Sequence, residues 1–140
     1  MSRAKGISRV QRTLNELRKL GRPCQVVERR NQFVGPHGIS EDLFGIVDVL
    51  ALDPERGFVG VQVCGSDWQP HVRKMTEEKA QECHDWLSTP GGVLELWGWR
   101  KVKKILITGK RGKQAVWRPR IADIILEGED VVLVERGKKQ

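Results

Sequence analysis

Several features that would place a chain of 140 residues in a familiar functional class are missing from this sequence. Its three cysteines are widely spaced and form no Cys-x-x-Cys pair, which excludes a disulfide framework and argues against structural zinc. It has no apolar run of membrane-spanning length and no apolar segment of a secretory signal. A glycine-rich phosphate-binding fingerprint and a Gly-x-Ser-x-Gly elbow are also missing. We therefore expect reduced thiols, a cytoplasmic location, no membrane contact and no nucleotide cofactor.

Positive charge, by contrast, is in excess and lies in two blocks. The formal net charge is +7. Residues 1–30 hold nine Lys or Arg against two Glu, and residues 96–122 hold nine more and no acidic residue. Charge scattered over the surface would serve solubility equally well, whereas concentrated blocks are typical of proteins that contact a phosphate backbone. The charge pattern therefore predicts a nucleic-acid partner.

Helical and strand patterns alternate along a chain of single-domain length, which predicts one α/β domain over residues 1–140. The predicted helices cover residues 7–20 and 76–88, the second with Thr76 as N-cap. The predicted strands cover residues 24–28, 46–52, 58–64 and 93–99. Loops are predicted over residues 31–40 and 65–70. In the last third of the chain, residues 105–108 and 114–118 are predicted to form a hairpin with a basic tip. Two apolar segments follow at residues 121–127 and 131–134, and they are either edge strands or a dimer surface.

Asp48 and Gln62 are polar residues within two apolar runs that a short turn joins. Because alternate side chains of a strand point to opposite faces, both are expected on the face turned away from the valines of the second run. A carboxylate within an apolar strand is costly unless it is paired, hydrogen-bonded or bound to a metal. Asp48 beside Gln62, with Glu41 or Asp42 just upstream, would gather the oxygen ligands that suit Mg²⁺.

The order of these elements resembles the PD-(D/E)XK nuclease superfamily, and is most similar to the small Holliday-junction resolvases of archaea and phages. Asp48 matches the metal-binding Asp of that family, Gln62 falls on its second acid, and Cys64 falls on its Lys. The resemblance extends to the strand near Trp97. It implies a restriction-endonuclease-like fold, with a mixed central sheet flanked by helices. It also implies an Mg²⁺-dependent homodimer, with Mn²⁺ as substitute, that nicks four-way or branched DNA in a prokaryotic cell or phage-infected host.

The departures from the family pattern decide which residues could act. Gln62 keeps an oxygen ligand but loses a charge, and Cys64 removes the cation. We expect Lys74 to supply that cation, with His71 as the other candidate on the same segment. The predicted catalytic set is Asp48, Gln62 and Lys74.

Other positively charged residues are predicted to contact DNA. They are Arg29, Arg30, His71, Arg73, Arg100, Lys101, Lys110 and Arg111. Trp97 and Trp99 share one face of their strand, where they either fill the core or stack on a base. The loss of the motif Lys leaves an alternative open, a non-catalytic DNA-binding protein that keeps the nuclease fold. RNA binding is a weaker alternative, since no RNA-binding module is recognisable.

Overall fold

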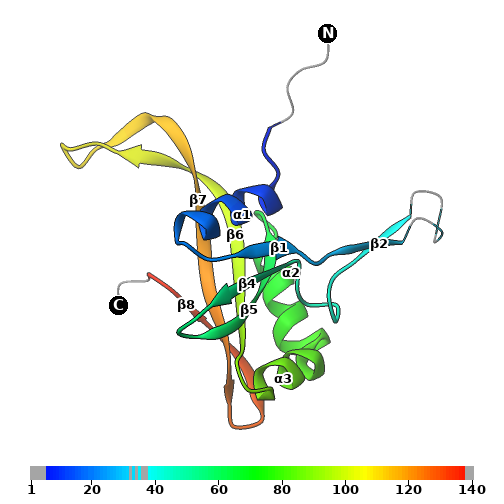
Figure 1. Cartoon of the computed structure of the whole chain (residues 1–140). Coiled ribbons are helices and arrows are strands. Elements are labelled where there is room, and N and C mark those ends of the chain that lie inside the picture. The colour runs from blue at the N-terminus through cyan, green and yellow to red at the C-terminus, as the bar shows by residue number, and fades with distance from the viewer. Residues whose placement is uncertain (1–5, 32, 34, 36–37, 138–140) are drawn as a thin grey trace.

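The computed structural model describes residues 6–31, 33, 35 and 38–137, and they form one α/β domain (Figure 1). Its centre is a mixed six-stranded sheet with strand order β1-β4-β5-β6-β7-β8. The sheet strands are β1 (Cys24–Val26), β4 (Val49–Asp53), β5 (Gly57–Cys64), β6 (Gly92–Ile105), β7 (Arg111–Glu127) and β8 (Asp130–Glu135). Strands β5 and β6 are parallel and the other neighbouring pairs are antiparallel. The predicted single α/β domain is thus confirmed at this level.

Helices cover both faces of the sheet. On one face, α1 (Arg9–Lys19) packs Leu14 and Leu17 against inward-facing residues of β4 and β5. On the other face lie α2 (Trp68–Arg73), a π-helical turn η1 (Lys74–Glu78) and α3 (Ala80–Ser88). The domain therefore has two hydrophobic cores, one on each face of the sheet. Alternate side chains of a strand point to opposite faces, so neighbouring residues of β6 contribute to opposite cores.

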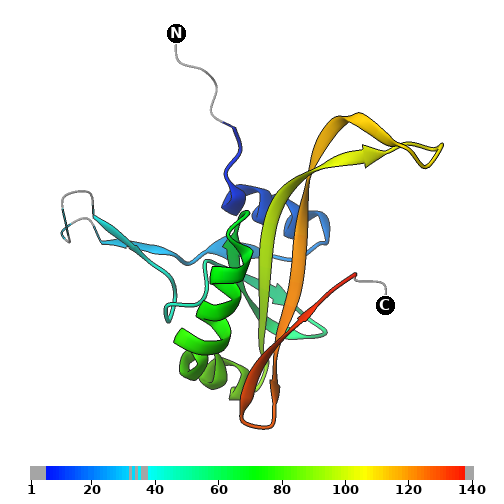
Figure 2. The same ribbon diagram turned by 180° about the vertical axis from the view of Figure 1, so that it is seen from behind.

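Two extensions project from this body on opposite sides (Figures 1 and 2). One is an antiparallel pair of β2 (Arg29–Asn31) and β3 (Ile39–Glu41), called here the β2–β3 arm. The other is the far part of β6 and β7, residues 99–119, called here the ribbon. Neither β5 nor β8 pairs with the ribbon, since their ladders stop at Gly98 and Ala122.

The sequence expectations differ from the structure in several places. Residues 31–40 were expected to form only a loop, whereas their ends belong to β2 and β3, and residues 32, 34, 36 and 37 lie outside the described part. The second helical segment begins at Trp68 instead of Thr76. Pro70 is compatible with this earlier start because a first helical turn makes no use of its missing N–H.

The hairpin predicted between residues 105–108 and 114–118 has other bounds, because β6 ends at Ile105, residues 106–110 form the turn and β7 begins at Arg111. The other predicted elements lie close to their expected positions. The first helix, the strand after the turn at residues 53–57 and the strand from residue 93 begin close to where the periodicity placed them, whereas β4 begins at Val49 instead of residue 46, so Asp48 lies just before the strand. The apolar segments after residue 120 form the end of β7 and β8 and pair with each other. Within the described residues, no helix is both long and apolar enough to cross a membrane.

Candidate metal centre

Asp48 and Gln62 lie side by side at the edge of the α2–α3 face. The pairing of Val49 with Val61 places the two residues opposite each other on adjacent chain segments. Gln62 Nε2 donates to Asp48 Oδ2 at 3.0 Å, and the Val63 backbone N–H donates to the same oxygen at 2.8 Å. Asp48 is 7% exposed and Gln62 1%. The juxtaposition predicted from the alternation of strand residues is therefore present.

A tight turn at residues 42–47 brings the Asp42 side chain next to Gln62 and Asp48. The Gly45 N–H donates to the Asp42 carbonyl at 2.9 Å, and Phe44 takes a left-handed conformation with φ of 54°. Gln62 Nε2 donates to Asp42 Oδ2 at 3.0 Å and to the Ile46 carbonyl at 3.1 Å. Between the two upstream acids that the sequence left open, the turn selects Asp42. Glu41 is exposed on β3.

Lys74 completes the cluster from the helical side. Its Nζ donates to Gln62 Oε1 at 2.7 Å and to Asp42 Oδ2 at 3.1 Å. Lys74 is the first residue of η1, where the Lys79 N–H donates to the Lys74 carbonyl at 2.7 Å across five residues. π-helical turns of this kind occur often at functional sites because they insert one residue and re-aim side chains. The predicted replacement for the motif Lys thus touches both Gln62 and Asp42.

Glu28 is the member of the cluster that sequence reasoning missed. It follows β1, and the Val27 N–H donates to the Asp48 carbonyl at 2.9 Å, which draws this end of the strand to the site. Glu28, Asp42 and Asp48 each offer a carboxylate oxygen, and these oxygens lie within 4.8 Å of one another. The signal available in the sequence was a carboxylate at the end of a strand that pairs beside Asp48.

Burial and charge give the two aspartates opposite protonation behaviour. Burial, together with the hydrogen bond and the charge of Asp42, raises the pKa of Asp48 to about 8. Burial also opposes ionisation of Asp42, but hydrogen bonds from Asp48, Gln62 and Lys74 outweigh it and lower the pKa of Asp42. The pair therefore holds one proton near neutral pH, on Asp48, which donates toward ionised Asp42.

Cys64, at the position of the motif Lys, does not take part in this chemistry. Its side chain is 1% exposed and packs in the core with Trp68. Burial raises the pKa of the Cys64 thiol to about 12, so it stays neutral. His71 lies near Cys64, with Nδ1 at 2.8 Å from the Asp67 carbonyl oxygen. The structure therefore places Lys74, and not His71, in contact with Gln62.

The donor set at Asp48 fits a hard divalent cation. Three carboxylates and one side-chain amide are the oxygen donors that Mg²⁺ takes in proteins. In the present arrangement, however, the Gln62 amide turns its nitrogen toward both aspartates and its oxygen toward Lys74. To ligate a cation through oxygen, the amide has to turn over, and the Lys74 ammonium has to leave Gln62 Oε1.

The residues predicted to contact DNA lie on several separate elements. Arg29 and Arg30 lie on the β2–β3 arm and Arg73 on α2. The ribbon holds Arg100, Lys101, Lys110 and Arg111, all exposed. Of the two alternatives for Trp97 and Trp99, core packing is confirmed and stacking on a base is excluded. They are 1% and 4% exposed in the core under α1, because their strand face packs against that helix.

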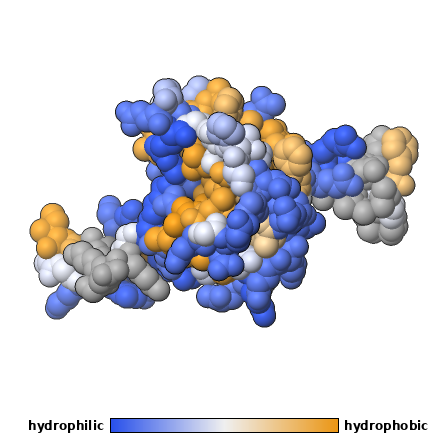
Figure 3. Space-filling model, turned by 90° about the horizontal axis from the view of Figure 1, so that it is seen from below, coloured by the Kyte–Doolittle hydropathy of each residue, from blue (hydrophilic) through white to orange (hydrophobic). Residues whose placement is uncertain are grey.

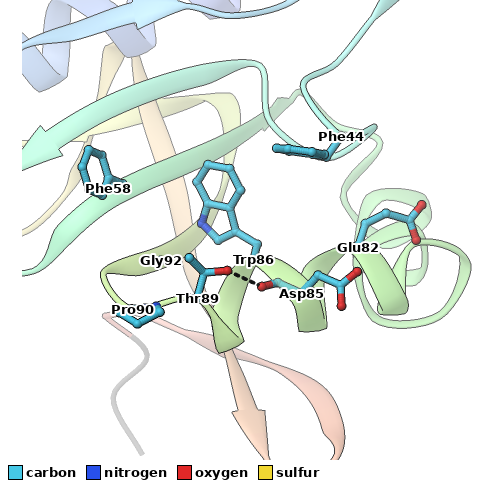
Figure 4. A pocket seen from close by; sticks show the side chains of 8 residues that line it. All are labelled: Phe44, Phe58, Glu82, Asp85, Trp86, Thr89, Pro90 and Gly92. Atoms are coloured by element: carbon cyan, nitrogen blue, oxygen red, sulfur yellow. Dashed lines mark hydrogen bonds between the residues drawn. The ribbon is translucent and has the colours of Figure 1, made fainter.

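A second concave feature lies away from the cluster, on the underside of the molecule. Apolar side chains gather there (Figure 3), around a cavity of about 340 Å³ (Figure 4). It is lined by Phe44, Phe58, Glu82, Asp85, Trp86, Thr89, Pro90 and Gly92. Trp86 is fixed in its wall, since Trp86 Nε1 donates to the Val93 carbonyl at 2.8 Å. The cavity has no basic residue in its lining, so it is unsuited to a phosphate backbone.

Comparisons of this chain with protein-family models, with curated proteins and with solved structures find no match.

Proposed function

We propose that this protein is a metal-dependent DNA endonuclease that acts on branched DNA, most like a Holliday-junction resolvase that makes paired nicks. One observation carries the proposal. Asp48, Gln62 and Lys74 come from separate segments, yet Gln62 contacts both of the other side chains. The resemblance to the PD-(D/E)XK nucleases assigns Asp48 and Gln62 to metal binding, and Lys74 is the cation that we expect to replace the motif Lys, whose position Cys64 occupies. We interpret the fold as restriction-endonuclease-like on the same basis, with the ribbon as its basic hairpin.

The roles of the residues follow from their charges and positions. Asp48 and Gln62, with Asp42 and Glu28 beside them, would hold Mg²⁺ or Mn²⁺. The cation would supply an activated water and stabilise the charge that builds on the phosphate. Lys74 would turn its ammonium from Gln62 to the scissile phosphate or the attacking water.

The wider surface supports DNA as the substrate. The arm and the ribbon carry exposed cations on two sides of the body, so each can contact a different part of a branched molecule (Figures 1 and 2). A junction needs two symmetric nicks, and a homodimer would supply two sites. We place the protein in the cytoplasm of a prokaryotic cell or phage-infected host, which suits its three free cysteines.

One contact favours the alternative, a non-catalytic DNA-binding protein. Lys74 Nζ lies 3.1 Å from Asp42 Oδ2, where an ammonium can neutralise the acidic cluster without a metal. The side chains of the pair are only 26% and 17% exposed, so this contact is partly shielded from water. If Lys74 stays there permanently, the fold and the DNA surface remain and the chemistry is lost.

The two functions are separated by a cleavage assay on a labelled four-way junction, a matched duplex and a single strand, each with Mg²⁺, Mn²⁺ or chelator. We expect paired, symmetric nicks in the junction with either metal. The Asp48→Ala and Lys74→Ala variants should lower the rate by about 100-fold or more, as loss of a charge-stabilising group does. Lys79→Ala is the matched control, because Lys79 lies on the same helical segment and pairs with Glu82.

Each outcome assigns one function. Tight, salt-sensitive binding of the junction without cleavage in any metal would establish the non-catalytic alternative. Cleavage by Asp48→Ala at the wild-type rate would contradict the proposed metal centre. Wild-type cleavage by Lys74→Ala would remove Lys74 from the mechanism and leave the metal centre intact. Sedimentation of the protein with the junction tests the homodimer separately.

A further inference from the structure

An exposed tryptophan lies at the base of the ribbon, on the outside of the molecule. Trp117 is 40% exposed, whereas Trp97 and Trp99 on the neighbouring strand are buried. Two cations flank its ring: the Arg12 guanidinium carbon is 4.6 Å from the ring centroid and Lys101 Nζ is 5.3 Å away. Lys101 is the direct cross-strand partner of Trp117, and Arg12 approaches from α1. An aromatic face is thus held between two positive charges that come from different elements.

A basic cleft adjoins this tryptophan. Its volume is about 580 Å³, and Lys101 belongs both to the cleft and to the surroundings of Trp117. The lining residues are Lys101, Val102, Lys103, Lys104, Arg111 and Arg118. The cleft therefore combines five cations with one apolar side chain and no carboxylate. This composition fits several consecutive phosphates.

The cations of the ribbon have no acidic partners of their own. Residues 100–118 contain eight Lys or Arg and no Asp or Glu, and across the described chain none of these eight forms an ion pair. Arg100 even lies directly opposite Arg118, an arrangement that destabilises a strand pair. Four arginines of the body differ, since Arg22, Arg56, Arg120 and Arg136 each contact a carboxylate. The positive charges of the ribbon are therefore not neutralised by neighbouring carboxylates of the described residues, in contrast to those of these four arginines.

We infer that the ribbon is a binding site for single-stranded DNA, in which an unpaired base stacks on Trp117 and the neighbouring phosphates lie in the basic cleft. A base that stacks on Trp117 displaces Arg12 or Lys101 from the ring, and the displaced cation is then close enough to pair with the phosphate of that nucleotide. Stacking needs an exposed base face, which duplex DNA withholds within its helix. The site therefore selects unpaired nucleotides such as those at a branch point. This inference rests on the proposed function only because it takes DNA as the partner.

Binding in chelator tests the site without cleavage. The probe is a fluorescently labelled 20-nucleotide oligothymidylate, measured by anisotropy beside a 20-base-pair duplex. Trp117→Ala should weaken binding of the oligothymidylate by about tenfold, the usual effect of losing one stacking platform. Trp117→Phe should restore binding to within about threefold, and duplex affinity should change less than about twofold in both variants. Quenching of tryptophan emission on binding should be reduced in Trp117→Phe even though that variant still binds.

Other results overturn the inference. The inference would be overturned if Trp117→Ala bound oligothymidylate with wild-type affinity. It would also be overturned if the substitution lowered the affinity for single strand and duplex equally. Thymidine monophosphate that binds as tightly as the oligomer would assign the site to free nucleotides, and a clear preference for oligouridylate would assign it to RNA. Metal-dependent cleavage of the four-way junction by the wild-type protein is the separate readout of the nuclease proposal. Junction cleavage by a wild type that does not bind oligothymidylate would overturn this inference alone, and oligothymidylate binding without junction cleavage in any metal would overturn the nuclease proposal alone.

Discussion

Asp48 is held as a neutral acid by the side chains that surround it. The Val63 N–H and the Gln62 amide donate to one of its oxygens, Asp42 lies beside it, and only 7% of the residue is exposed. Its pKa near 8 compares with about 3.9 for an aspartate in an unfolded chain. The folded protein therefore retains a proton between these two values that the unfolded chain releases.

This difference predicts a loss of stability as pH rises. In chelator, the free energy of unfolding of the wild type should fall between about pH 4 and pH 8, because over this window the native state binds more protons. Asp48→Asn has nearly the shape of the protonated acid and no proton to lose. We expect its stability relative to the wild type to rise by about 3–4 kcal/mol between pH 5 and pH 8.5, because the wild type loses stability over that range and the variant does not. Urea denaturation at the two pH values measures this, and parallel pH profiles would contradict the assignment of the proton to Asp48.

At the scale of elements, helix α1 is attached by a narrow apolar stripe and turns its basic face outward. Leu14 and Leu17 are buried against β4 and β5, while Leu20 at the end of the helix is 57% exposed. Thr13 adds a polar anchor, since its Oγ1 accepts from Trp99 Nε1 at 2.9 Å. The same packing carries Arg12 to Trp117, so the position of this helix also shapes the proposed single-strand site.

The two leucines of α1 give a matched pair of substitutions. Leu17→Ala leaves a cavity in a fully buried position and should lower the free energy of unfolding by about 2–5 kcal/mol. Leu20→Ala removes mostly exposed surface and should change it by less than about 0.5 kcal/mol. Chemical denaturation with both helical and tryptophan signals provides the measurement. Equal effects of the two substitutions would show that α1 does not depend on this stripe.

On the scale of the whole molecule, charge is sorted between surfaces. The ribbon cations form no ion pairs within the described chain, while Glu82 and Asp85 line the apolar cavity on the underside. A polyanion is therefore expected to approach the ribbon and to avoid the underside. We therefore expect substitutions of the ribbon cations to change DNA binding more than the stability of the domain, because β6 and β7 pair only with each other in the ribbon.

The salt dependence of DNA binding should report how many ribbon cations contact phosphates. Replacing Lys103, Lys104, Lys110 and Arg111 by Gln should reduce the slope of log affinity against log salt on duplex DNA by about 3 to 4. The melting temperature should stay near that of the wild type, since these side chains form no ion pairs within the described chain. Lys79→Gln, away from the ribbon, is the control. An unchanged slope in the quadruple variant would exclude the ribbon from the duplex interface.

The sequence by itself determined the features that depend on short-range geometry. Two-residue alternation placed Asp48 and Gln62 on one face, a three- to four-residue period gave α1, and counting charges located the basic ribbon. Only the tertiary structure decided which groups from distant segments meet there. The turn at residue 44 selected Asp42 over Glu41, the earlier helix start and its π-helical turn aimed Lys74, and strand pairing added Glu28. Packing against α1 likewise buried Trp97 and Trp99 and left Trp117 exposed. The physical reason is that local sequence fixes the direction of a side chain within its element, whereas side-chain contacts depend on how whole elements pack.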